Sequence, residues 1–237
     1  MGFFNSNLAQ EVIRLTGWKD KVWSRRYQSI PISNEDAAQI ARLKYVLAHG
    51  VKEGLVEKVS QWPGVHAAPA LLSGQSVEGT WFNRSRQHAA RVRGKDASDE
   101  RFAEAETLSL IPLPCWKDLP AEEYRARIAH LIEEIETEAA AQREQTGRKP
   151  LGARAILRQD PRTEPNRTKK SPAPRFHAFR KRVRQELYEA YAWFLSAFRD
   201  AAEKLKAGDR TVSFPIGSFP PGLPFVRGLT AAAIASG

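Results

Sequence analysis

A tyrosine and a histidine stand four residues apart in the segment RLKYVLAHGVKEGLV, which covers residues 42–56. Residues at this spacing lie on one face of a helix, so the phenol of Tyr45 and the imidazole of His49 would act on the same target. Tyrosine can serve as a covalent nucleophile, and histidine as a metal ligand or a base. The alternative is an amphipathic helix whose tyrosine packs inward and whose histidine marks a frayed end.

The element that must present these side chains is a helix that begins after SNED. Ser33 and Asp36 have the spacing of a capping box, and Gly50 predicts the end of the helix. Its apolar stripe consists of Ile40, Leu43, Val46 and Leu47. Tyr45 lies beside this stripe rather than at its centre, which favours presentation of its hydroxyl group.

The rest of the pattern predicts an α+β fold that is mostly α. Apolar periodicity indicates a first helix over residues 3–16 and two long helices over 120–146 and 178–207, which we expect to pack as an antiparallel pair. Alternation over 21–32 predicts a strand that ends at Pro31. Two shorter extended segments are expected at GTWFNRS and ETLSLIPLPCW.

A polar segment, RGKDASD, predicts a domain boundary near residue 95. Residues 1–95 would form a small α/β unit that contains the tyrosine helix. Residues 96–237 would form a helical unit with a basic loop and a proline-rich tail, FPIGSFPPGLPFV, whose apolar side chains we expect to lie across the helices. A proline-rich ligand motif is the alternative for this tail.

The overall charge points to an anionic partner. The 237 residues contain 37 lysines and arginines against 27 acids, a net charge of +10, which favours nucleic acid or an anionic membrane surface. No apolar run approaches the roughly 20 residues that span a bilayer, and the first residues do not resemble a signal peptide, so we expect a cytoplasmic protein. Cys115, the only cysteine, excludes an intrachain disulfide and a cysteine-cluster metal site.

The cations concentrate between residues 148 and 184, where only Asp160 and Glu164 oppose them. Those at the start of the last helix oppose the helix dipole, a conflict that a bound phosphate would relieve. The alternative is a solvated basic loop. The cations expected to contact DNA here are Arg148, Lys149, Arg154, Lys169, Lys170, Arg175, Arg180, Lys181, Arg182 and Arg184.

A smaller group of cations lies among aromatic residues near the N-terminus. It consists of Lys19, Lys21, Arg25 and Arg26, beside Trp18, Trp23 and Tyr27. This mixture suits a single strand, whose phosphates meet the cations while its bases stack on the rings. We expect Arg25 and Arg26 to contact DNA, although a hairpin face packed around a tryptophan has the same pattern.

The ordered series NSNLAQEVIRLTGWKDKVWSRRYQSIPI, LKYVLAHGVKEGLV and WPGVHAA resembles the C-terminal half of the REP-associated tyrosine transposases. These belong to the single-tyrosine, His-hydrophobe-His transposases. Several blocks match the family pattern in order and spacing over residues 5–68. Residues 96–237 lie outside the common core and look like the C-terminal extension of one subgroup.

The resemblance implies a chemistry for the tyrosine helix. In this family a helix-borne tyrosine attacks a phosphodiester of single-stranded or hairpin DNA, which leaves a 5′-phosphotyrosine link and a free 3′-hydroxyl, with Mg or Mn polarising the phosphate. By position Tyr45 would be the nucleophile. His49 stands where the family has an asparagine or glutamine on the metal side, Gly50 replaces a proline, and Lys52 keeps the basic residue and is expected to contact DNA.

The sequence departs from the family in its histidines. The family's metal-binding pair, spaced His-x-His on a strand, precedes the first matched helix, and the five histidines here form no such pair. We therefore expect a truncated α/β unit whose metal-ligand set is incomplete, so that the chain alone would not cut DNA. The alternative is a non-enzymatic helical protein that binds DNA or RNA.

Overall fold

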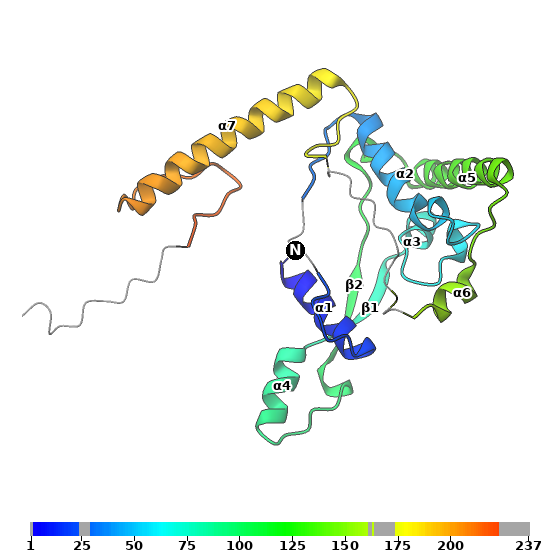
Figure 1. The fold of residues 1–237 in the computed structure, drawn as a ribbon, viewed down its shortest axis with the longest axis horizontal. Coiled ribbons are helices and arrows are strands. Elements are labelled where there is room, and N and C mark those ends of the chain that lie inside the picture. The colour runs from blue at the N-terminus through cyan, green and yellow to red at the C-terminus, as the bar shows by residue number, and fades with distance from the viewer. Residues whose placement is uncertain (1, 24–28, 161–162, 164–173, 223–237) are drawn as a thin grey trace, which may run out of the picture. The chain divides into compact units, whose positions relative to one another are not determined.

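The protein is mostly helical with one small antiparallel sheet, which confirms the α+β, mostly α class (Figure 1). The computed structural model describes residues 2–23, 29–160, 163 and 174–222. In chain order the elements are α1 (Gly2–Thr16), α2 (Asp36–Lys52), η1 (Val59–Gln61), α3 (Ala68–Ser73), β1 (Val77–Phe82), α4 (Arg84–Val92), η2 (Glu100–Phe102), β2 (Ala103–Leu108), η3 (Pro114–Trp116), α5 (Ala121–Thr146), α6 (Ala153–Arg158) and α7 (Lys181–Lys206).

The chain divides into two compact units, residues 1–177 and residues 178–237. The boundary predicted near residue 95 falls inside the first unit, between α4 and β2. A separate domain over residues 1–95 remains a prediction. Among the residues that the structure describes, no helix combines the length and the apolar character that crossing a bilayer requires.

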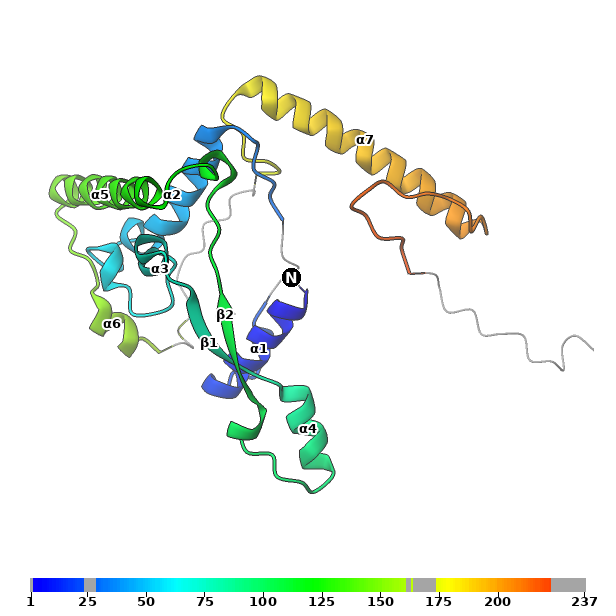
Figure 2. The same cartoon turned by 180° about the vertical axis from the view of Figure 1, so that it is seen from behind.

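The core of the first unit lies where α2, α3 and α5 meet (Figure 1, Figure 2). Leu47 from α2, Ile128 from α5 and Val56 from the loop after α2 are its most completely buried large side chains. Each such side chain contributes about 1.5–3 kcal/mol through the removal of apolar surface from water. This packing fixes the orientation of α2 about its own axis.

Both ends of α2 differ from the sequence prediction. The residue before the first turn is Glu35, with φ −70° and ψ 127°, and no side chain caps the helix. The predicted capping box is wrong because Ser33 Oγ instead donates a hydrogen bond to Glu35 Oε2 at 2.8 Å. The helix also runs through Gly50, where the backbone lies close to Trp62, and ends before a turn at Gly54, whose φ is 68°.

The sheet is a two-stranded ribbon between α3 and α4 (Figure 2). Strands β1 and β2 pair antiparallel from Val77 opposite Leu108 to Phe82 opposite Ala103. All six residues of β2 are exposed. Both short extended segments that the sequence indicated are therefore present, with somewhat shifted bounds, and they pair with each other.

Helix α5 has the predicted length but a different partner. Its buried side chains, Ile128, Leu131 and Ile135, belong to the core that α2 and α3 complete. Gly147, with φ 65°, ends the helix as expected. Helices from the first third of the chain cover this face, and the expected antiparallel packing of α5 with residues 178–207 stays a prediction.

The second unit is built on the single long helix α7. Residues 209–222 after the helix have no regular secondary structure, and Phe214 meets Phe198 edge to face with ring centroids 5.5 Å apart. This contact confirms, for one residue, that the proline-rich tail lies on the helix. The last residues of the predicted tail, from 223, lie outside the described residues.

The strand predicted over residues 21–32 falls partly outside the described residues, since 24–28 are among those not described. At its end Ile32 forms an isolated parallel bridge with His177. The backbone N–H of His177 donates to Pro31 O at 2.9 Å, and that of Ser33 donates to His177 O at 2.8 Å. These contacts join the backbone of residues 31–33 to that of His177, just before α2 begins.

Candidate nucleic-acid interface

Tyr45 lies on the solvent side of α2 between two cations. Its side chain is 44% exposed, and its ring centroid lies 5.1 Å from the Arg42 guanidinium carbon and 5.2 Å from Lys52 Nζ. The His49 ring stands edge-on with its centroid 6.0 Å from that of Tyr45. Both cations are within reach of the ring's negative face. We call Arg42, Tyr45, His49 and Lys52 the Tyr45 face.

A groove of about 350 Å³ runs between α2 and α5 beside Tyr45. Its apolar lining comes from Ala41, Ala48, Ile135 and Ala139, and its polar lining includes Lys44, Glu138 and Gln142. A volume of this size lies at the lower end of the range for ligand pockets. The groove is thus an open surface that combines small apolar residues with several hydrogen-bonding groups.

The carboxylates of α5 near this groove are engaged by Lys44. Its Nζ lies 2.7 Å from Glu138 Oε1 and 3.0 Å from Glu134 Oε2. These hydrogen bonds, that to Glu138 foremost, raise the pKa of Lys44, and the bond from Lys44 lowers the pKa of Glu134. In the described part of the chain Arg42 and Lys52 have no carboxylate partner, so their charges remain available to an anion.

The residues around Tyr45 do not fit the Mg or Mn that the transposase resemblance implies. These ions prefer several oxygen ligands, and His49 stands alone beside two cations that would repel a divalent ion. Within the described ranges no group of three His, Cys, Asp or Glu side chains could hold a metal. We therefore derive no step of a reaction through a metal at this position.

The basic segment that follows α5 is attached to the first unit near both ends of α2. After α2, the N–H groups of Leu151 and Gly152 donate to Gly54 O and Leu55 O at 2.9 and 2.8 Å. Before α2, the backbone of His177 is hydrogen-bonded to the backbone of Pro31 and Ser33. Leu151, Gly152 and His177 of this segment are therefore held by backbone contacts on either side of the tyrosine helix.

His177 also contacts the Tyr45 face through a side chain. Arg42 Nη1 lies 3.3 Å from His177 Nε2, and this contact is a hydrogen bond when the imidazole is neutral and accepts from the guanidinium. Burial, followed by the charge of Arg42, lowers the pKa of His177. The neutral imidazole thus orients the same arginine that lies over Tyr45.

The predicted DNA-binding cations fall into three groups. The first unit holds Lys52, Arg148, Lys149, Arg154 and Arg175. The second unit holds Arg180, Lys181, Arg182 and Arg184, at the start of α7. Outside the described residues lie Arg25, Arg26, Lys169 and Lys170. Contact of any of these with DNA remains a prediction.

Three residues of this region were missed at the level of sequence. Arg42 precedes Tyr45 by three residues, so a helical projection could have placed it on the same face as the tyrosine. Lys44 adjoins Tyr45, and the same projection places it on the neighbouring side of the helix, which packs against α5. His177 carried no such signal, because it reaches Arg42 across 135 positions of the sequence. Only the backbone pairing with residues 31–33 brings it there.

No protein-family model matches the chain, and searches of curated proteins and of solved structures give no match. The function must therefore be inferred from the chemistry of the Tyr45 face. An exposed aromatic ring lies on α2 between two cations that have no carboxylate partner among the described residues, beside a groove whose acid, Glu138, is engaged by Lys44.

Proposed function

We propose that this protein binds nucleic acid, single-stranded or hairpin DNA in particular, through the Tyr45 face. The observation that carries the proposal is the exposed Tyr45 ring between Arg42 and Lys52. A strand that passes this face can place phosphates on the cations and stack a base on the ring, the combination by which single strands are bound. The net charge of +10 attracts the polyanion from a distance.

The resemblance extends the proposal to transposition-type chemistry at Tyr45. In that reaction the phenol oxygen bonds to phosphorus, the bond from phosphorus to the 3′ oxygen breaks, and that oxygen takes up a proton. A neutral phenol is a poor nucleophile until a base or a metal activates it. Tyr45 makes no hydrogen bond within the described residues, and the sequence contains no His-x-His pair. We expect the chain alone to bind DNA without cutting it.

Binding is tested with a labelled DNA hairpin that carries a single-stranded extension, measured by fluorescence anisotropy over a range of salt. In the double variant Arg42→Gln, Lys52→Gln we expect weaker binding and a salt slope smaller by about 1.4, since each lost single-strand phosphate contact contributes about 0.7. Tyr45→Ala should lose about 1–3 kcal/mol of stacking, whereas Tyr45→Phe should keep it. The matched control is Arg127→Gln, which removes an exposed α5 cation paired with Glu123.

Unchanged affinity and salt slope in the double variant would remove the Tyr45 face from the proposal. Cleavage is tested separately by incubating the same hairpin with the protein and Mg or Mn, then separating products on a denaturing gel. We expect no covalent adduct. An adduct that is lost in Tyr45→Phe would show that the phenol is activated after all.

A non-enzymatic nucleic-acid-binding protein is the second candidate. It is favoured by the absence of a metal-ligand set beside Tyr45 within the described ranges. An RNA hairpin of matching sequence separates this candidate from the first, because a transposase-type protein should prefer DNA. Equal or tighter binding to RNA, together with no adduct on DNA, would favour the second candidate.

A further inference from the structure

A second basic surface lies on α4 and the turn after it. Residues 79–95 contain five cations and no acid. Arg84 points into the protein, whereas the other four have no carboxylate partner within the described residues. We call these four residues, Arg86, Arg91, Arg93 and Lys95, the α4 face.

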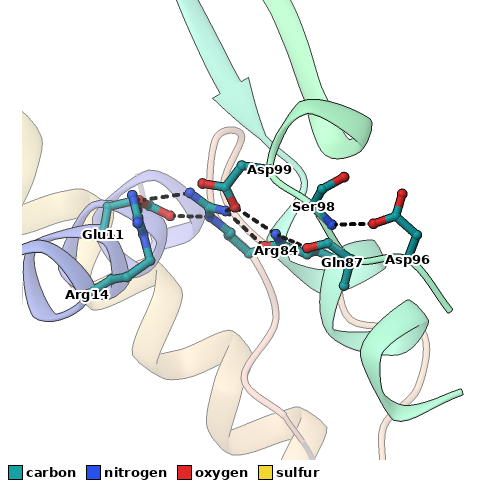
Figure 3. Close-up of polar contacts among 8 residues, drawn as sticks. Glu11, Arg14, Arg84, Gln87, Asp96, Ser98 and Asp99 are labelled. Carbon is teal, nitrogen blue, oxygen red and sulfur yellow. Dashed lines mark hydrogen bonds and ion pairs between the residues drawn. The ribbon is translucent and has the colours of Figure 1, made fainter. Parts of the chain in front are cut away.

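Two acids near this surface, Glu11 and Asp99, are engaged by Arg84, while Asp96, directly after Lys95, accepts a hydrogen bond from Ser98 N–H at 2.9 Å (Figure 3). Its Nε lies 2.6 Å from Glu11 Oε1, and its Nη1 lies 2.7 Å from Asp99 Oδ1 and donates to Gln87 Oε1 at 2.8 Å. The bond from Arg84 lowers the pKa of Glu11, and the bonds from Arg84 and then Gln87 lower the pKa of Asp99. One inward arginine therefore ties α4 to α1 and engages two of the acids near the outer cations.

The surface is hollowed where α1 and α4 meet. A cavity of about 660 Å³ is lined by the cations Arg14, Arg84 and Arg91, by His88, and by the two carboxylates that Arg84 engages. Arg91 thus faces both the open surface and a hollow that can admit a phosphate. Excess positive charge in a concave surface concentrates field lines on an incoming anion.

The helix dipole accounts for only some of the cations on α4. Cations in the last turn of a helix are stabilised by its dipole, which accounts for Arg91 and Arg93. Arg86 lies in the first turn, which holds no acid, and there a cation opposes the dipole. A bound phosphate would remove this conflict.

The composition of α4 favours nucleic acid over a membrane surface. Helices that lie on membranes bury a face of large apolar side chains in the lipid. The apolar residues of α4 are Ala89, Ala90 and Val92, and only the last is large. At the base of the helix the Phe82 ring lies under Arg84, with 4.4 Å between the guanidinium carbon and the ring centroid. This mixture is typical of single-strand binding.

We propose that the α4 face is a second contact for the phosphate backbone of the nucleic acid that the Tyr45 face binds, and this inference rests on the proposed function. The six residue pairs of β1 and β2 separate α4 from the core by about 20 Å, at about 3.3 Å per residue. A strand long enough to reach both faces gains from the linked second contact, whereas a short one occupies a single face.

The test compares two oligothymidylates, of about 8 and about 40 nucleotides, binding to the full chain. The variant replaces Arg86, Arg91 and Arg93 with glutamine, which keeps helix propensity. The control replaces Lys117, Lys204 and Lys206, exposed cations of which two also lie in the last turn of a helix. We expect the α4 variant to lose at least about tenfold in affinity for the longer strand, with a salt slope smaller by about 2, and the control to change little.

The shorter strand should bind the α4 variant with less than about twofold change, because the Tyr45 face still holds it. Unchanged affinity for the longer strand would overturn the inference while leaving the proposed function intact. If the Arg42→Gln, Lys52→Gln variant binds both strands normally and only the α4 variant is weakened, the proposed function loses its site and the α4 face remains a contact. The last measurement uses vesicles that contain phosphatidylserine. If the α4 variant loses vesicle binding while its oligonucleotide binding is unchanged, the inference is overturned in favour of a membrane surface.

Discussion

Replacing Arg84 with methionine should detach α1 from α4. The Arg84 side chain is only 15% exposed and holds Glu11, Gln87 and Asp99 at once. Helix α1 has no buried residue of its own. It therefore has little apolar packing to replace the arginine. Methionine fills a similar volume but donates no hydrogen bond, so the variant removes the polar contacts with little change in packing.

The size of the effect follows from two contacts. A hydrogen bond between charged groups contributes about 1.5–3 kcal/mol, and the pair with Glu11 belongs at the low end because the Glu11 side chain is 30% exposed and partly screened by water. Gln87 is 5% exposed, so its Oε1, left without its donor, adds about 1 kcal/mol. The Glu11 contact alone, about 1.5 kcal/mol, corresponds to roughly 10-fold in the opening of α1, whereas the sum of about 2.5 kcal/mol corresponds to roughly 60-fold in the opening of α4, which loses both contacts.

Native-state hydrogen exchange resolved by residue measures this opening. In Arg84→Met we expect amide protection to fall by roughly 10-fold in α1 and roughly 60-fold in α4, while protection in α2 and α5 is kept because their core is separate. Arg182→Met is the control, since its ion pair with Glu186 is more than half exposed on both sides and contributes at most about 1 kcal/mol. Equal losses in α1 and in the core helices would refute the reasoning, as would unchanged protection of α1.

The same contact has a defined pH dependence. Arg84 lowers the pKa of Glu11 below its usual value of 4.5, so the folded state favours the ionised carboxylate. The contribution of this group to stability is fully present above pH 4.5 and is lost as pH falls through the lower pKa of the folded state. The difference in α1 protection between wild type and Arg84→Met should therefore shrink as the pH is lowered toward about 3.

Two further predictions concern the first unit. A Cβ at Gly50 would lie 2.9 Å from the Trp62 ring, so Gly50→Ala should lower the free energy of unfolding by about 1–3 kcal/mol in denaturant titrations, whereas Gly79→Ala, with open space around it, should not. Burial lowers the pKa of His66 below its usual value of 6.5, and its Nδ1 accepts from Ala68 N–H at 3.1 Å, so the melting temperature should rise as the pH is raised toward 6.5 and level off above. In His66→Asn this rise should be smaller; an unchanged slope would exclude His66 as its source.

The long helices were predictable because each carries its own apolar period. Residues 120–146 repeat apolar side chains at helical spacing, and Gly147 stops them, so both the length and the end were readable from sequence. The partner of that helix was not. An apolar stripe states that a face is buried but not by what, and α2 and α3 compete for it with residues 178–207 on equal terms.

The candidate site likewise has a part that could be predicted from the sequence and a part that could not. Arg42, Tyr45, His49 and Lys52 follow one another at helical spacing, so their shared face is a property of the local sequence. His177 is placed by a backbone bridge to Ile32, and no periodicity links the two. The cations of α4 can be read from the sequence. The sequence does not show that Arg84 is paired with an acid, because Glu11 lies 73 positions before it.

The Tyr45 face is held in place by the burial of the opposite side of the same helix. At about 100° per residue, Leu47 points roughly 200° away from Tyr45, and Val51 follows Leu47 on the core side. Because both are almost fully buried, α2 cannot rotate to hide the tyrosine without exposing them, at about 1.5–3 kcal/mol for each. The exposure of Tyr45 is therefore imposed by the core. An anion that approaches Arg42 and Lys52 meets the ring already in position, and no helix rotation is needed to form the contact.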